Sequence, residues 1–168
     1  MITDPTYFVA DLHIENATVG HFDNAELSKA AELTRQIAIY EPELLKLILG
    51  ATLYAEYLVG GTQWDAFKAK IADATNKVSP ITNYVFFNYW PTFCIQSTMA
   101  GAVISKTENS ITLSVADKQR MVWNRMRRLL IDVFDWMDEN RSDYEHDDVT
   151  LDTTNWENLT TYMNWAGL

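Results

Sequence analysis

The residue types that most often do covalent chemistry are sparse in this sequence. The chain has one cysteine, Cys94, and three histidines, His13, His21 and His146. A thiol nucleophile needs a base beside it, but Cys94 lies in an apolar segment and the histidines lie near the two ends of the chain. We therefore predict a buried, inert thiol, no catalytic residue and no cofactor. One cysteine also excludes an internal disulfide and a zinc site built from several thiolates.

Carboxylates are concentrated towards the C-terminus. Residues 132–152 contain nine carboxylates and only one Lys or Arg, which is Arg141. The carboxylates are Asp132, Asp135, Asp138, Glu139, Asp143, Glu145, Asp147, Asp148 and Asp152. The alternation at Asp143, Glu145 and Asp147 is partly that of a calcium loop, but the required glycine and the terminal bidentate glutamate are missing. A metal hydrolase using these three residues with His146 is one alternative. We favour a solvated acidic face without a metal.

Such an acidic face has two possible electrostatic uses. Asp143, Glu145, Asp147 and Asp148 could line a passage that repels DNA phosphates, so that a duplex slides through without binding. Alternatively, the carboxylates of residues 132–152 could imitate a phosphate backbone and occupy a host protein that binds nucleic acid. The net charge of −10 argues against general nucleic-acid binding by the chain itself.

Five cations lie directly upstream of the acidic run. They are Lys118, Arg120, Arg125, Arg127 and Arg128. On a helix these positions spread around most of the circumference, so we predict pairing with acids of the same helix or of a neighbouring segment rather than with phosphate. A helix that is basic at its start and acidic at its end opposes its own macrodipole. Complementary association between copies would satisfy both ends.

The elements that position these residues are helical. The length of 168 residues, with 48% hydrophobic and 21% charged residues, predicts a single domain. Apolar spacing predicts an all-α antiparallel bundle of about five helices, with an extended N-terminal arm over 1–23, a helical domain over 24–141, and an acidic extension over 142–168 with a short terminal helix. No apolar run reaches the ~18 residues of a membrane span, and no leader is evident, so we expect an intracellular protein without membrane contact.

Prolines and capping residues predict where several of the helices begin and end. Pro42 is predicted to end a helix that begins at Asn24 and to begin the next one. An uncharged helix over 80–101 is predicted to be central, with a kink near Phe87 caused by Pro91. Residues 102–114 are predicted to form a loop, with a small hairpin as the alternative, and a capped helix follows over 114–141.

Aromatic side chains are unusually frequent, at 12% of the chain, and several lie in the end segments. The candidates for contacts are Tyr7, Phe8, Trp156, Tyr162 and Trp165. Two arrangements would hold them in place: packing back onto the same bundle, or docking on an adjacent subunit.

Four stretches carry a resemblance to a known family. They are 40–54 (YEPELLKLILGATLY), a helix-break-helix pattern that ends in apolar-apolar-Gly-x-x-Leu-Tyr, 79–89 (SPITNYVFFNY), 107–110 (TENS) and 118–124 (KQRMVWN). Together they resemble the small head-to-tail connector proteins of tailed bacteriophages, especially forms from phages and prophages of Bacteroides-like hosts. The resemblance covers about residues 24–140 and includes no catalytic fingerprint.

The resemblance implies a non-enzymatic structural protein of the virion neck, assembled in the host cytoplasm. Such a protein forms a homo-oligomeric ring of about twelve copies by head-to-tail contacts. The ring connects the portal protein at the capsid vertex to a downstream neck or tail protein. It surrounds double-stranded DNA, which passes without specific binding. An acidic inhibitor that mimics DNA remains the alternative.

Overall fold

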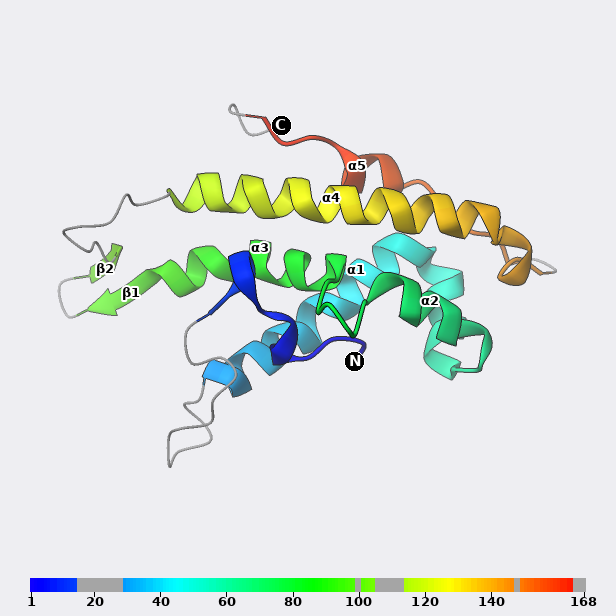
Figure 1. The fold of residues 1–168 in the computed structure, drawn as a ribbon, viewed down its shortest axis with the longest axis horizontal. Coiled ribbons are helices and arrows are strands. Elements are labelled where there is room, and N and C mark those ends of the chain that lie inside the picture. The colour runs from blue at the N-terminus through cyan, green and yellow to red at the C-terminus, as the bar shows by residue number, and fades with distance from the viewer. Residues whose placement is uncertain (15–28, 99–100, 105–113, 147–148, 165–168) are drawn as a thin grey trace.

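The computed structural model of the chain describes residues 1–14, 29–98, 101–104, 114–146 and 149–164. These ranges are mostly helical, which confirms the predicted all-α class (Figure 1). The elements are, in chain order, η1 (Pro5–Tyr7), η2 (Ala10–Leu12), α1 (Lys29–Val59), α2 (Gln63–Ile71), α3 (Pro80–Cys94), β1 (Ile95–Thr98), β2 (Gly101–Ile104), α4 (Val115–Glu139), η4 (Arg141–Asp143) and α5 (Trp156–Thr160). The η elements are single turns of 3₁₀ helix.

The first long helix, α1, has its break at a residue other than the predicted one. Pro42 lies inside α1, and the non-helical residue is Gly50, with φ 75° and ψ 171°. The prediction that Pro42 separates two helices is therefore wrong. The carbonyl that loses its donor to Pro42 belongs to Ala38, which is exposed, so water can satisfy it. Gly50 adopts a left-handed φ because it has no Cβ. The predicted start at Asn24 lies outside the described residues.

α3 is the central helix, as predicted. It packs against α1 on one side and runs antiparallel to α4 on the other (Figure 1). Ser79 caps its start, because the hydroxyl accepts the amide hydrogen of Ile81 at 3.1 Å and donates to the carbonyl of Ile71 at 2.9 Å. Every residue from 80 to 86 is buried. The core therefore forms around the uncharged segment that has no polar face.

A small hairpin follows α3. β1 pairs antiparallel with β2, with Ile95 opposite Ile104 and Thr98 opposite Gly101. The predicted helix over 80–101 therefore stops at Cys94, and the predicted loop over 102–114 begins as a strand. The reason is that a short apolar run containing β-branched residues fits a strand as well as a helix, so its periodicity does not distinguish them. Residues 105–113 lie outside the described part.

The N-terminal segment, predicted as an extended arm, is folded into the body over residues 1–14. Tyr7, Phe8, Leu12 and Ile14 all belong to the core. The buried carboxylate of Glu41 in α1 accepts hydrogen bonds from the backbone amides of residues 2 and 3 at 2.6 and 3.0 Å, and from the Thr3 hydroxyl at 3.0 Å. This charged acceptor anchors the start of the chain to α1.

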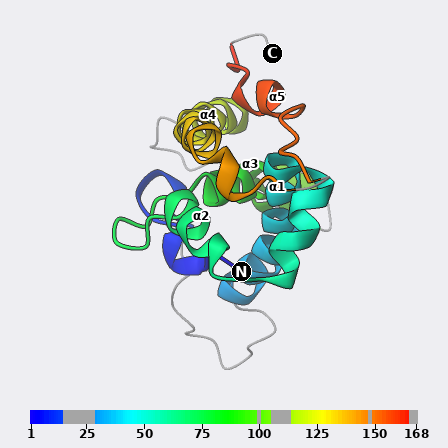
Figure 2. The same cartoon turned by 90° about the vertical axis from the view of Figure 1, so that its right-hand side faces the viewer.

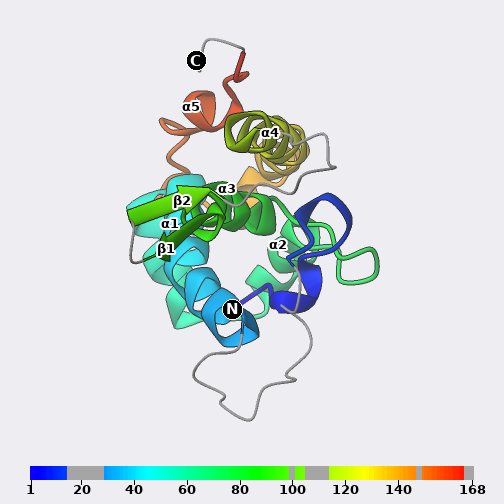
Figure 3. The same ribbon diagram turned by 90° about the vertical axis from the view of Figure 1, so that its left-hand side faces the viewer.

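The C-terminal segment also packs onto the body. α5 lies against α4, on the side away from the N-terminal segment (Figures 2 and 3). Tyr144, Leu151 and Leu159 are buried, so the acidic extension contributes apolar side chains to the core. α4 is therefore contacted by α5 on one side and by Asp11 of the N-terminal segment, at Arg125, on another.

Candidate functional site

α4 carries the densest set of charged side chains, and its core face fixes how they point. The buried residues of this helix are Val122, Met126, Leu130, Val133, Phe134 and Met137. All but Phe134 follow the apolar spacing from which the helix over 114–141 was predicted, and Leu129, which fits the same spacing, is half-buried. Because these residues form one stripe at helical spacing, the remaining positions of α4 face the surface or the flanking chain ends.

The start of α4 is capped as the sequence predicted. The Ser114 hydroxyl accepts the backbone amide hydrogen of Asp117 at 3.0 Å, and the two side chains bond at 2.7 Å. The Asp117 carboxylate also pairs with Arg120 at 2.6 Å. The hydrogen bond from Ser114, and then the interactions with Arg120, lower the pKa of Asp117. The cap therefore holds a carboxylate against the first cations of the helix.

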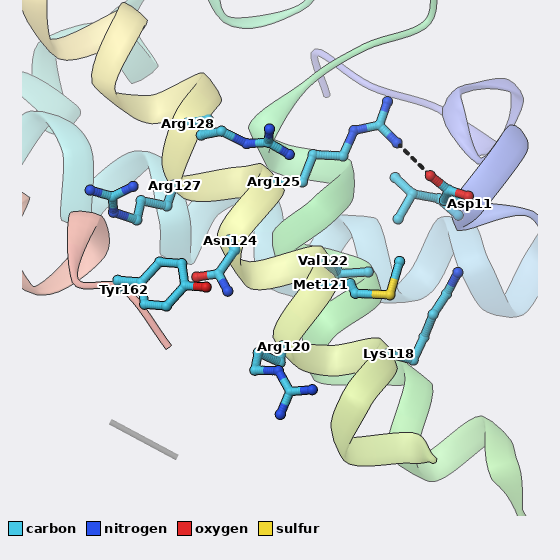
Figure 4. Close-up of a pocket in the computed structure, with 11 residues that line it drawn as sticks. Asp11, Lys118, Arg120, Met121, Val122, Asn124, Arg125, Arg127, Arg128 and Tyr162 are labelled. Atoms are coloured by element: carbon cyan, nitrogen blue, oxygen red, sulfur yellow. Dashed lines mark ion pairs between the residues drawn. The ribbon is translucent and has the colours of Figure 1, made fainter. Parts of the chain in front are cut away.

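The five cations of residues 118–128 share the solvent side of α4. They line a shallow pocket of about 450 Å³ together with Asp11 and Leu12 on one side and Tyr162 on the other. Figure 4 shows the guanidinium groups fanning out over the surface of the helix rather than meeting at one point. The prediction that they spread around most of the circumference is therefore corrected, because the buried stripe takes up the opposite side of the helix. The apolar spacing of residues 122–137 was the signal that could have shown this.

Three of these cations have close partners. Arg120 pairs with Asp117 in its own helix, and Arg125 lies 3.6 Å from the carboxylate of Asp11. These two contacts confirm the predicted pairing with an acid of the same helix or of a neighbouring segment. Arg127 donates to the carbonyl of Thr160, and its guanidinium lies 6.0 Å from the centre of the Tyr162 ring. Arg128 is exposed and makes no ion pair within the described ranges.

The second half of α4 reverses the sign of the surface. Asp132, Asp135, Asp138 and Glu139 are all exposed. Asp138 pairs with Arg141 at 2.6 Å, just past the end of the helix. The solvent side of α4 is therefore positive over its first half and negative over its second. This is the charge order that opposes the helix macrodipole.

The predicted DNA-facing carboxylates are only partly available. Asp143 is exposed. Glu145 is occupied inside the fold, since it accepts from Arg141 at 3.2 Å and from the backbone amide of Leu151 at 2.9 Å. Asp147 and Asp148 lie outside the described residues. Within the described part, therefore, Asp143 presents a free acidic surface and Glu145 stabilises the turn that follows α4.

The predicted contact aromatics divide into two groups. Tyr7 and Phe8 are 4% and 1% exposed, so they are core residues of this chain. Trp156 stacks on Phe134 with ring centres 4.2 Å apart, and its indole Nε1–H donates to the carbonyl of Ile48 at 2.9 Å. For these three, the structure shows packing onto the same bundle. Tyr162 is 62% exposed, and Trp165 lies outside the described residues.

The hydrolytic alternatives find no site in the described ranges. No group of three or more His, Cys, Asp or Glu side chains in that part of the chain is placed to hold a metal ion. His146, named with Asp143 and Glu145 as a possible ligand, lies 3.2 Å from Glu56 of α1 instead. Asp147, the fourth residue of that set, and the side chain of Cys94 lie outside the description.

Comparison with known proteins gives no relative. No family model, no curated protein and no solved structure matches the chain. Among the described helices, none alone is long and apolar enough to cross a membrane, and the pair 30–59 and 63–71, bent by 118°, meets the length and composition criteria only as a pair.

Proposed function

We propose that the chain is a structural component of a phage neck, which forms a ring between the portal protein and a downstream neck or tail protein. In this role its surfaces bind copies and partners, and its side chains do no covalent chemistry. The ring would surround double-stranded DNA without binding it specifically, and it would be found in the virion neck after assembly in the host cytoplasm.

The observation that carries the proposal is the break in α1. The resemblance to connector proteins rests first on a helix-break-helix segment that ends in apolar-apolar-Gly-x-x-Leu-Tyr. In the structure the glycine of that segment, Gly50, is the residue with non-helical φ and ψ. The break in this segment therefore lies at Gly50 and not at Pro42, where the sequence predicted it.

The surface of α4 supports an assembly role. A solvent side that is positive in one half and negative in the other offers a complementary contact to a second protein surface. An exposed tyrosine, Tyr162, and the half-exposed Met121 lie among the cations. Aromatic and Met side chains within a charged rim are typical of protein contact surfaces.

The alternative of an acidic inhibitor that mimics DNA has less support. Such a protein needs a continuous acidic face with the spacing of phosphates. The exposed acids of α4 begin at Asp132, directly after Arg128, the last cation of the basic half. Glu145 is not free, because it accepts hydrogen bonds from Arg141 and from a backbone amide. The described carboxylates therefore form a short face beside an opposite charge.

Co-expression tests the proposal. The chain is expressed with its genomic neighbours, and the products are examined by electron microscopy and native mass spectrometry. We expect a ring of this chain seated on the portal ring. Free chain in the presence of an assembled portal, or purified particles that lack the polypeptide, would contradict the proposal. A monomer in isolation would not, because such subunits can stay apart until they meet their template.

A further inference from the structure

Four charged residues of α4 are spaced at intervals of seven. They are Lys118, Arg125, Asp132 and Glu139, and their signs run plus, plus, minus, minus. Seven residues are nearly two helical turns, so the four side chains lie in one stripe and successive members are about 10 Å apart along the axis. We name this set the α4 charge stripe.

The stripe lies on the accessible side of the helix. Asp132 and Glu139 are exposed, and Lys118 and Arg125 are half-buried. Lys118 lies 5.7 Å from the centre of the Phe86 ring, and Arg125 lies 3.6 Å from Asp11. Within the described residues, no ion pair forms at Lys118, Asp132 or Glu139. Most of the charge in the stripe is therefore available to a partner.

We propose that two copies of the chain pair antiparallel through the α4 charge stripe. A two-fold axis perpendicular to α4, passing between Arg128 and Leu129, places Lys118 opposite Glu139 of the partner subunit and Arg125 opposite Asp132 of the partner subunit. Symmetry repeats both pairs, so four opposite-charge pairs form. A parallel alignment in register places like charges opposite each other. The charge order thus selects a closed, isologous pair.

The surroundings of the stripe fit a helix better than a small anion. The cations of the first half fan out along the helix surface in Figure 4 and do not converge on one centre. Met121, which is 49% exposed, lies in the same pocket and supplies an apolar contact at the seam. Arg125 can keep Asp11 while it binds a second carboxylate, because a guanidinium has five N–H donors.

The net charge of the chain sets the conditions for pairing. Each copy carries −10, so two copies repel each other at long range. At about 0.15 M salt the Debye length is about 8 Å, which screens distant charges more than pairs in contact. We therefore expect pairing to be strongest at intermediate ionic strength, and weaker both near 0.01 M salt and near 1 M salt.

The inference does not depend on the proposed ring. Copies in a ring on a portal share one orientation, so an antiparallel pair has to open before or during ring formation. If the chain does not form the antiparallel pair, ring formation on the portal can still be tested by co-expression. Failure of the ring leaves the pair to be measured by sedimentation.

The test uses the full chain and two matched charge reversals. Lys118→Glu with Arg125→Glu makes the stripe entirely acidic, and Asp132→Lys with Glu139→Lys makes it entirely basic. Analytical ultracentrifugation at about 0.15 M salt should show pairs for the natural chain. Each double variant alone should pair at least about tenfold more weakly, and an equimolar mixture of the two should recover pairs. The chain with all four reversals should pair with itself again. Circular dichroism shows whether each variant folds.

Three results would overturn the inference. One is a natural chain that stays monomeric at all three ionic strengths. Another is a mixture of folded double variants that forms no heterodimer. The third is open-ended growth beyond two copies, since this would show a head-to-tail contact instead of a two-fold one. A natural chain that binds a DNA duplex through the basic half of α4 and does not pair with a second copy would overturn the inference in the same way as a monomeric chain.

Discussion

The side-chain amide of Gln119 donates a hydrogen bond of 3.1 Å to the backbone carbonyl of Phe87. Phe87 lies four residues before Pro91, so its carbonyl is the one that Pro91 leaves without a helical donor. Gln119 belongs to α4 and Phe87 to α3, and the bond therefore joins the two helices where Pro91 interrupts the hydrogen bonds of the central helix.

We expect Gln119→Leu to destabilise the fold by about 1 kcal/mol, because a partly buried carbonyl loses its donor. The measurement is the free energy of unfolding in urea. The matched control is the same change in a Pro91→Ala background, where the residue at position 91 supplies the missing amide. In that background the cost should fall to near zero. An equal cost in both backgrounds would show that Gln119 acts through packing alone.

Trp156, like Gln119, donates a side-chain hydrogen bond to a backbone carbonyl where a helix is interrupted, here at the break in α1. In a continuous helix the carbonyl of Ile48 would bond the amide of residue 52, and non-helical Gly50 lies between them. The indole of Trp156 donates to this carbonyl at 2.9 Å. We expect Trp156→Ala to cost about 3 kcal/mol of folding stability and Trp156→Phe, which keeps the stacking on Phe134, about 1 kcal/mol. A thermal unfolding midpoint unchanged by either variant would return Trp156 to the contact residues for an adjacent subunit.

Gly50 is expected to tolerate no side chain. A Cβ there would lie 2.5 Å from the Cβ of Asp152, in addition to the strain of φ +75°. Gly60 has φ +87° with nothing within 4 Å of its Cβ position, so Gly60→Ala measures the backbone strain alone. We expect Gly60→Ala to cost about 1 kcal/mol and Gly50→Ala clearly more. Combining Gly50→Ala with Asp152→Gly should recover part of the difference, and equal losses for both alanine variants would rule out the clash.

Glu41 should be essential for docking the first residues of the chain. Its carboxylate is 3% exposed and accepts from residues 2 and 3. Glu41→Ala leaves two amides without an acceptor, and we expect a loss of about 3 kcal/mol in urea unfolding. Glu43→Gln at the exposed neighbour, which can still accept from Tyr84, should cost less than about 0.5 kcal/mol. Unchanged resistance of residues 1–14 to proteolysis in Glu41→Ala would argue against this anchor.

Acid should weaken the turn after α2. Asp73 accepts from the amides of Thr75 and Asn76, both at 2.9 Å, and from the Asn76 side chain at 2.7 Å. The hydrogen bonds from Asn76 and Thr75 lower the pKa of Asp73 below its ordinary value of 3.8. A lowered pKa gives stability that is present above the ordinary value and lost as the pH falls through the folded value.

Asp73→Asn should therefore lower the urea midpoint at about pH 7, and the difference from the natural chain should shrink as the pH falls below 3.8 and through the lowered pKa of Asp73. Asp143→Asn removes an exposed carboxyl elsewhere and controls for the change in net charge. A difference between Asp73→Asn and the natural chain that is constant across this pH range would show that ionisation of Asp73 contributes nothing to stability.

The sequence was informative where several local signals agreed. For α4, the Ser114 cap and the apolar stripe from Val122 to Met137 indicated the same helix, and the structure confirms it. Pro42 was misleading because the effect of a proline depends on whether water reaches the carbonyl four residues earlier. The residues that pack against the break at Gly50, Asp152 and Trp156, lie about a hundred residues further along, and the pattern around Gly50 does not contain these contacts.

The candidate site was predictable in its residues but not in its arrangement. The five cations and the following carboxylates were found, and pairing with an acid of the same helix or of a neighbouring segment is present at Arg120 and Arg125. That the five cations share the solvent side of α4 was not predicted, although the apolar stripe of the same helix left no room for cations on its buried side. The burial of Tyr7 and Phe8 was one of two arrangements left open, since an aromatic residue in an end segment has no partner within its own stretch of sequence that decides between them.

The bond between Trp156 and Ile48 spans 108 residues. A growing polypeptide on the ribosome makes the broken helix long before it makes the indole that completes it. This bond can therefore form only after residue 156 has been translated, and shorter products lack the contact between α1 and the C-terminal segment. The sequence of α1 is therefore complete well before the side chain that donates to its break exists.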